Sequence, residues 1–348
     1  MSQAWHPCAS SDNAGAFWCL KERFGIMPQG EQVKNGKAFE YSLAYQYYRY
    51  LQSIGKSVKL VEDSAMSIAR GFYHEMDDAK RKGFDLAAMN TIDTMLKIEP
   101  GLYAQKSKND VLSIMLQSDD EGRDGDVRDV VFSRINPSWE IGFSAKNNND
   151  AVKHSRLSHI LDFGKEWVGC PCSNTYWKEI QPVFEYLKDK KRAGLNFDSL
   201  GDEKISLVYK PLLSAFRKEM MRIYNDNEGI PEKLIKYLIG KHAFYKIIKD
   251  DSHNLVIVKA FNIDNELNKT VNKEKSRYKT AKINFPTRIV EFAPMKGRED
   301  TTLDMIMDGG WEISFRIHNA DKPIVLSLKF DIQLLGNPPI LFTQHLFR

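Results

Sequence analysis

The chain has 348 residues, of which 42% are hydrophobic and 28% charged, and its formal net charge is +4. This balance is typical of a folded globular protein with an ample core and argues against general disorder. No early apolar run follows a basic start, and no apolar span approaches the roughly 18 residues of a membrane helix. We therefore expect a cytoplasmic protein.

The predicted elements begin after an N-terminal arm, residues 1–35, which mixes Gly, Pro, Ser and aromatic residues without a period. Hydrophobic periodicity and end signals predict helices over residues 36–53, 64–82, 84–98, 151–163, 174–191, 211–226 and 231–249. Apolar or alternating runs predict strands over residues 111–116, 128–134, 140–146, 252–263, 283–292, 311–318 and 324–335. This order indicates an α+β fold with an α/β core and a β-rich C-terminal region. We divide the chain into the arm, a core over residues 36–195 and a helical and β-rich region over residues 196–348.

The four cysteines are few and scattered, at Cys8, Cys19, Cys170 and Cys172. A disulfide framework would need a more regular set in a chain of this size. Neither pair has the two-residue gap that is usual in zinc sites, so zinc is the less favoured interpretation. We expect buried or inactive thiols.

Residues 126–146 carry most of the information about chemistry. Asp129 opens one short apolar run, and a second run alternates up to Lys146. Successive side chains of a strand point to opposite faces. The residues that would share a face are Glu140, Gly142, Ser144 and Lys146. If the two runs pair as a hairpin, Asp129 lies beside Lys146, where the carboxylate can hold Mg²⁺ and the lysine can orient water and offset phosphate charge.

A second metal-binding carboxylate would be expected two residues before the lysine, but Ser144 stands there. A hydroxyl is a poorer Mg²⁺ ligand, so the second acidic group must come from elsewhere. Glu40 is the first alternative, because a helix packed on the sheet can project a carboxylate toward the metal. Asp126 and Glu140 follow, although Glu140 lies about 13 Å along the strand from Ser144 at ~3.3 Å per residue. Ser144 and Glu140 remain candidate catalytic residues on the same face.

Three segments offer side chains for DNA. The first segment, residues 147–156, follows the predicted strand that ends at Lys146. Its asparagine amides can pair with adenine, and its basic residues favour phosphates or guanine. A plain polar turn is an equal interpretation. The candidates there are Asn147, Asn148, Asn149, Lys153, His154 and Arg156. In the second, residues 266–288 carry seven basic residues against two acidic ones, including Lys275, Arg277 and Lys279. This excess suits a polyanion groove, with a solvated loop as the alternative.

The third segment, residues 311–319, alternates cleanly. One side carries Trp311 and other apolar residues and is predicted to face the core. The other side carries Arg316 and His318, with Asn319 following, and offers donors suited to guanine in a major groove.

Several of these motifs resemble the HaeIII-type type II restriction endonucleases. The resemblance lies in the segments Glu140–Lys146, Ala151–Leu157, Trp311–Asn319 and Ser327–Asp331 and in the more generic opening Gly36–Tyr41. It implies a PD-(D/E)xK nuclease core, a mixed sheet flanked by helices, and Mg²⁺-dependent cleavage of double-stranded GGCC at its centre to leave blunt ends.

The same resemblance assigns Asp129 as the metal-binding aspartate and Lys146 as the motif lysine. Arg128 stands where the superfamily often has proline, and Ser144 replaces the second acidic residue. These departures favour a migrated glutamate such as Glu40. We therefore predict a sequence-specific endonuclease, with a homodimer as the default for a palindromic target and a DNA methyltransferase as functional partner. The alternatives are a structure-selective repair nuclease and a DNA-binding protein with an inactive nuclease core.

Overall fold

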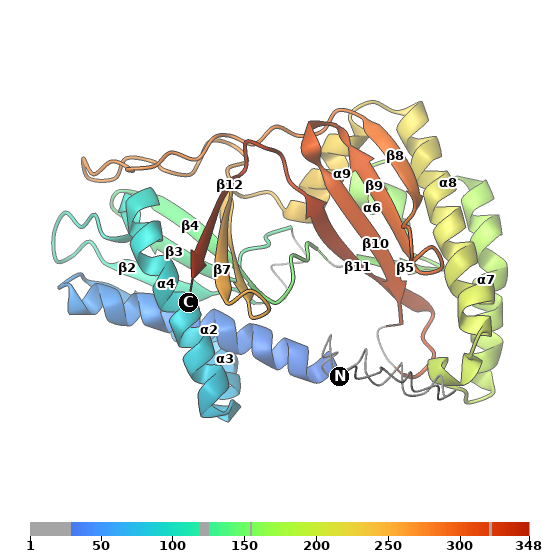
Figure 1. Ribbon diagram of the computed structural model, residues 1–348, viewed down its shortest axis with the longest axis horizontal. Helices are drawn as coiled ribbons and strands as arrows, with labels where there is room; N and C mark the ends of the chain where they lie inside the picture. The colour runs from blue at the N-terminus through green and yellow to red at the C-terminus, as the bar shows by residue number, and fades with distance from the viewer. Residues whose placement is uncertain (1–28, 119–124, 154, 320–321, 348) are drawn as a thin grey trace, which may run out of the picture.

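The structure, a computed structural model, describes residues 29–118, 125–153, 155–319 and 322–347. Residues 1–28 of the predicted arm, with Cys8 and Cys19, and the candidate His154 lie outside the described residues. Two lobes lie side by side, each built on one sheet (Figure 1). Among the described helices, none is long and apolar enough to cross a membrane.

The first lobe contains a seven-stranded mixed sheet in the order β1-β2-β3-β4-β6-β7-β12. Its strands are β1 (Val58–Leu60), β2 (Leu112–Leu116), β3 (Val130–Arg134), β4 (Trp139–Asn147), β6 (Phe244–Asp250), β7 (Leu255–Phe261) and β12 (Phe342–Phe347). The pairs β1–β2 and β4–β6 are parallel, and the other pairs are antiparallel. The β3–β4 hairpin is the one expected from the sequence, and the turn between its strands contains a cis peptide bond before Pro137.

Three helices pack on this sheet: α2 (Gln29–Ser53), α3 (Ser64–Glu75) and α4 (Asp78–Ile98), followed by the short η1 (Pro100–Leu102). Tyr47 of α2 is fully buried, and its ring centroid lies 5.3 Å from those of Phe132 and Phe143 on the hairpin. Such aromatic contacts fix α2 against β3 and β4. The N-cap of α3 is Asp63, whose side chain accepts from Met66 N–H.

The second lobe contains a five-stranded antiparallel sheet in the order β5-β11-β10-β9-β8. Its strands are β5 (Ser155–Ser158), β8 (Ile289–Pro294), β9 (Thr302–Met307), β10 (Glu312–His318) and β11 (Ser327–Gly336). The helical elements of this part of the chain are α6 (Phe163–Val168), α7 (Asn174–Arg192), η2 (Phe197–Leu200), η3 (Lys204–Tyr209), α8 (Lys210–Asp226), α9 (Ile230–Ile239) and η4 (Asp308–Gly310).

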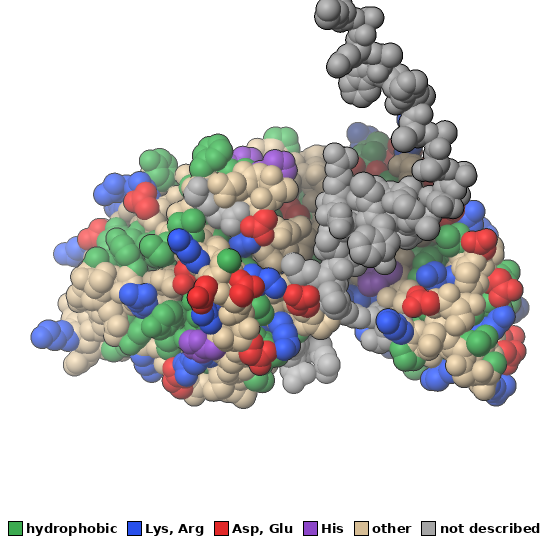
Figure 2. Space-filling view, turned by 60° about the horizontal axis from the view of Figure 1, so that its bottom comes forward, with side chains coloured by type: hydrophobic (Ala, Val, Ile, Leu, Met, Phe, Trp, Pro, Cys, Tyr) green, Lys and Arg blue, Asp and Glu red, His purple; other side chains and the backbone are tan. Residues whose placement is uncertain are grey.

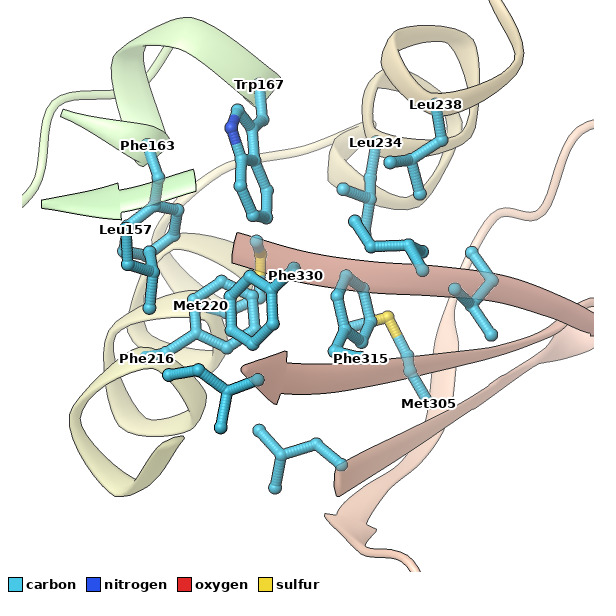
Figure 3. Packing of buried hydrophobic residues seen from close by; sticks show 14 of the residues in the cluster. Leu157, Phe163, Trp167, Phe216, Met220, Leu234, Leu238, Met305, Phe315 and Phe330 are labelled. Carbon is cyan, nitrogen blue, oxygen red and sulfur yellow. The ribbon is translucent and has the colours of Figure 1, made fainter. Parts of the chain in front are cut away.

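Helices cover one face of this second sheet. Phe315 and Phe330 project from the strands toward Phe216 and Met220 of α8 (Figure 3), and the Phe216 and Phe330 ring centroids are 4.9 Å apart. The residues that alternate with these, including Arg316 and Asp331, lie on the other face of the sheet. The sheet therefore has one core face and one polar face.

The predicted class, an α+β fold with a mixed sheet flanked by helices and a β-rich C-terminal region, is confirmed. Two predicted helices are wrong. Residues 151–163 instead contain β5, because residues 155–158 pair with β11 and bury Leu157 completely. The helix over 231–249 ends at Ile239, because the next residue, Gly240, adopts the non-helical φ of 89°. A Cβ at residue 240 would lie 2.8 Å from Gly125 O, so glycine is required there.

The strands of the first sheet come from both sides of residue 195, where the sequence analysis ends the core. β6, β7 and β12 lie beyond that boundary, yet they extend the sheet that starts with β1 to β4. β5 lies before the boundary and belongs to the second sheet. The sheets therefore do not follow the division of the sequence at residue 195.

Candidate active site

The β3–β4 hairpin places an aspartate and a lysine side by side. Asp129 precedes β3, and its backbone N–H donates to Phe143 O at 2.7 Å, which extends the pairing with β4 by one residue. Lys146 Nζ lies 3.4 Å from Asp129 Oδ2. The same carboxylate oxygen accepts from Ala145 N–H at 2.7 Å and from Ser144 Oγ at 3.2 Å. The structure therefore brings Asp129, Ser144 and Lys146 together as the alternation predicted.

This group faces a cavity of about 450 Å³ between the lobes. The lining residues include Lys37, Asp129, Ser144, Lys146, Lys153 and Lys246. The Asp129 and Lys146 side chains are about one quarter exposed, at 23% and 25%. They are therefore accessible to a ligand in the cavity, and the lysines make its wall attractive to anions.

Glu40 lies beside this pair on α2. It is buried, and its Oε2 accepts from Lys37 Nζ at 3.1 Å. Burial and then the negative charge of Asp129 raise the pKa of Glu40 to about 7, against the opposing charges of Lys37 and Lys146. A carboxylate destabilised by a second carboxylate in this way gains from a cation placed between them.

The donor set of Asp129 and Glu40 fits a hard divalent cation. Mg²⁺ prefers oxygen ligands and is usually held by one or two carboxylates, with waters and substrate phosphates in the other positions. Within the described ranges, no group of three or more His, Cys, Asp and Glu side chains could hold a metal by itself. Cys170 and Cys172 are free thiols, and Cys172 is buried.

The other two carboxylates proposed from the sequence, Asp126 and Glu140, bind Arg128. Arg128 Nη2 lies 2.6 Å from Asp126 Oδ2, and Nη1 lies 2.7 Å from Glu140 Oε1. Burial alone would raise the pKa of Asp126, but hydrogen bonds from Arg128 and Gln117 bring it below its ordinary value. Both acids therefore hold the arginine that precedes Asp129, and Glu40 is the carboxylate that lies next to the Asp129–Lys146 pair.

Gly142 provides the space in which Arg128 lies. A Cβ at residue 142 would be 2.3 Å from Arg128 Cδ and 2.6 Å from its Cγ. We expect Gly142→Ala to displace Arg128 from its carboxylates and to lower the free energy of unfolding by about 1–3 kcal/mol, the usual cost of overpacking, as measured by urea denaturation. The control is Gly36→Ala in α2, where a Cβ meets nothing within 4 Å. Equal losses of stability in the two variants would contradict this packing.

The chain bends at Asn148, directly after the end of β4. Asn148 has φ 59°, donates from Nδ2 to Asp251 Oδ2 at 2.9 Å and accepts from Asp251 N–H at 2.8 Å. Asn149 donates to Asn147 O at 2.9 Å. These bonds account for the amides at residues 148 and 149 as turn residues, so contact of this segment with bases remains a prediction.

The basic candidates that follow lie between the cavity and the polar face of the second sheet. Lys153 lines the cavity, with its Nζ 4.5 Å from the centroid of the Tyr237 ring. Arg156 pairs with Lys329 across β5 and β11, and Arg316 Nη2 lies 2.7 Å from Asp331 Oδ2.

His318 and Asn319 are held more closely by the protein than Arg316 is. Burial lowers the pKa of His318, whose Nδ1 lies 3.0 Å from Asn319 O. The Asn319 side chain accepts from Tyr209 Oη at 3.0 Å. Among these three candidates, Arg316 therefore has the most accessible donors, with 48% of its side chain exposed.

The basic segment 266–288 contacts both lobes, since Asn268 N–H donates to Glu99 at 2.7 Å and Asn284 O accepts from Trp311 Nε1 at 3.0 Å. Its exposed candidates are Lys275, Arg277 and Lys279. Asn272 in the same segment donates to Asp110 at 3.2 Å, and Asp110 also binds Arg134 at 2.9 Å. Arg134 pairs with Trp139, the first residue of β4, whereas Lys146 lies near the last. Asn272 is thus attached near Trp139, which lies about 23 Å along β4 from Lys146 at ~3.3 Å per residue.

Two cavity residues, Lys37 and Lys246, were not identified from the sequence. Lys37 lies one turn before Glu40 on α2, and its spacing to that acid was the available signal. Lys246 is on β6, in a stretch that the sequence assigned to a helix, and it is only 2% exposed.

Comparisons with known proteins agree on one family. The family described as HaeIII restriction endonuclease matches residues 36–338. The type II restriction enzyme HaeIII of Haemophilus aegyptius is 34% identical over 305 residues, which cover 87% of this chain and 94% of that enzyme. No solved structure matches the chain.

Proposed function

Because the chain belongs to the HaeIII restriction endonuclease family and is a type II site-specific deoxyribonuclease, we propose that it cuts double-stranded GGCC at its centre to leave blunt ends. We also propose that the reaction requires Mg²⁺ and that the group around Asp129 and Lys146 performs it. The observation that carries this assignment is the 3.4 Å approach of the two side chains at the cavity, with Glu40 beside them.

Asp129 and Glu40 are the proposed cation ligands. A divalent cation held by them supplies positive charge to the oxygens of the scissile phosphate. Asp129 keeps a fixed orientation because Ala145 N–H and Ser144 Oγ both bind its Oδ2. Its other oxygen can therefore be directed at the cation without a change of rotamer.

Lys146 is the proposed residue that orients the attacking water. Its ammonium group is held on the cavity side of β4 by Asp129, so it can donate to a water and offset the charge that develops on the phosphate. In-line attack by that water breaks the P–O3′ bond and leaves 5′-phosphate and 3′-hydroxyl ends. The water loses a proton to solvent or to a phosphate oxygen, and the leaving O3′ takes a proton from solvent.

The DNA would lie across the cavity and the polar face of the second sheet. In Figure 2 the two lobes are seen as two masses, and Lys and Arg side chains (blue) lie on both. Lys153 at the cavity would contact a phosphate, and Arg316, half exposed on the polar face, is suited to guanine O6 and N7. The segment 266–288 would contact only DNA that extends beyond the cut site.

GGCC is palindromic, so the two strands present equivalent scissile bonds. Two copies of the chain related by a twofold axis would cut both strands in one encounter, and we propose a homodimer on this ground. A methyltransferase that modifies the same sequence is the proposed functional partner, because an unprotected genome would be cut.

The test is digestion of a plasmid of known sequence with Mg²⁺ and, in parallel, with EDTA. The proposal expects discrete fragments only with Mg²⁺, and sequenced ends that are blunt and lie between G and C of GGCC. Fragments at another sequence would overturn the target. A smear would indicate a nuclease without sequence preference, and an intact plasmid that shifts on a gel would indicate a binding protein.

A further inference from the structure

One row of side chains runs from Asp129, which precedes β3, across β4, β6 and β7 beside the active site. Asp129 contacts Ser144, whose Oγ is 3.2 Å from its Oδ2. Ser144 on β4 pairs with Lys246 on β6, and Lys246 pairs with Lys259 on β7. Direct partners in a sheet project to the same face, and neighbouring strands lie about 4.8 Å apart. Lys246 is thus one strand from Ser144, and Lys259 is two.

The two lysines of this row share one carboxylate. Lys246 is 2% exposed, and its Nζ binds the side chain of Asp150 and, at 3.1 Å, the Asp150 carbonyl oxygen. Lys259 is 7% exposed, and its Nζ binds the other Asp150 oxygen and, at 3.3 Å, Asn337 Oδ1. Two ammonium groups and one carboxylate leave this buried cluster with a net charge of +1, which is costly in a protein interior without an anion.

The shortage of negative charge affects Lys246. Burial, together with the positive charges of Lys146 and Lys259, lowers the pKa of Lys246 to about 8 against the opposing effect of Asp150. Asp150 occupies two of its three donors, and among the described residues no third acceptor is within hydrogen-bonding distance. An anion in the cavity would compensate this charge.

The cavity distinguishes the two lysines. Lys246 lines it together with Asp129, Ser144 and Lys146, whereas Lys259 does not. We propose that Lys246 is a second cationic group of the active site, which stabilises the negative charge of the scissile phosphate from the side opposite Asp129. This inference rests on the proposed function of the cavity as the site of DNA cleavage.

The test compares Lys246→Met with Lys259→Met. Each removes one buried ammonium group and leaves Asp150 paired with the other, so both are expected to fold with similar thermal stability. The proposal expects the single-turnover rate constant for cleavage of a GGCC duplex to fall at least 100-fold in Lys246→Met and less than 5-fold in Lys259→Met. Similar rates in the two variants would overturn it. Cleavage by the wild type and by Lys259→Met separately verifies the proposed function.

A binding measurement tests the contact with phosphate without catalysis. In EDTA, a methylphosphonate at the cleaved position removes one negative charge from the duplex. The wild type and Lys259→Met should lose affinity for this duplex relative to the normal one, and Lys246→Met should lose at least 5-fold less. An unchanged loss in Lys246→Met would show that the residue only supports the fold.

If Lys246→Met does not fold, Lys246→Arg and Lys259→Arg replace the first pair. Both keep the positive charge but move it, because the guanidinium group is larger and planar. Only Lys246→Arg is expected to slow cleavage, by at least 10-fold relative to Lys259→Arg. Equal rates in this pair would also overturn the proposal.

Discussion

Replacing Asp129 with Asn should abolish DNA cleavage without weakening DNA binding. The amide keeps an oxygen that can accept from Ala145 N–H, as the carboxylate does at 2.7 Å, so the start of β3 should stay in place. The substitution removes the negative charge of Asp129, which the cation needs. We expect the single-turnover rate constant to fall by at least about 10²- to 10³-fold, the usual effect of removing one electrostatic element of an active site.

Lys146→Met should slow cleavage to a similar extent, but of the two variants only Lys146→Met should lower DNA affinity. Loss of the Asp129 charge removes repulsion with phosphate, so affinity in EDTA should stay equal or rise. Loss of the Lys146 charge should lower it a few-fold. The measurements are quenched single-turnover assays and fluorescence anisotropy on one GGCC duplex.

The control for both variants is Lys188→Met, which removes an exposed charge on α7. It should leave the rate unchanged. Cleavage by either active-site variant within 10-fold of the wild-type rate would refute the assigned roles of Asp129 and Lys146.

The part of the site that could be predicted from sequence is the part that local rules determine. Asp129 and Lys146 belong to one hairpin, and a period of two residues fixes which side chains share a face. Pairing then places the two groups together without any information from the rest of the chain. The role of each side chain remains a prediction that the variants above test.

Contacts between distant segments could not be predicted in this way. The assignment of β5 depends on β11, about 170 residues later, and an isolated reading of residues 151–163 favours a helix. Lys246 was not identified as a cavity residue because the apolar residues after Gly240 continue a helical pattern. The signal that could have corrected this was the glycine itself, a common helix stop.

The choice among three acids illustrates the same limit. Asp126, Glu140 and Glu40 are equally plausible ligands as residue types. Arg128 decides between them, since it binds Asp126 and Glu140, and it can do so only because Gly142 leaves the space. Glu40 approaches Asp129 because α2 packs on the hairpin through Tyr47. Ser144 at the usual acidic position is thus compatible with a two-carboxylate site.

Glu40→Gln should therefore remove most of the activity and also its dependence on pH. The pKa of Glu40 lies at about 7 before a cation binds, raised by burial and by Asp129. At pH 6 the group is mostly protonated and neutral, and at pH 8 it is mostly ionised, so cation binding should strengthen as pH rises. We expect the Mg²⁺ concentration for half-maximal cleavage to decrease as the pH rises from 6 to 8. The decrease should be at most about 10-fold for each pH unit below the pKa of Glu40.

In Glu40→Gln this pH dependence should disappear, and the rate at saturating Mg²⁺ should fall at least about 100-fold. Asp126→Asn and Glu140→Gln are the matched comparisons, because they neutralise the competing acids at the same site. They loosen Arg128, so a smaller loss of rate is expected, with the Mg²⁺ and pH dependence retained. The assignment of Glu40 would be refuted if Glu140→Gln or Asp126→Asn abolished the Mg²⁺ dependence and Glu40→Gln did not. The second cation ligand would then be the acid replaced in that variant, and Arg128 would have to move when the cation enters.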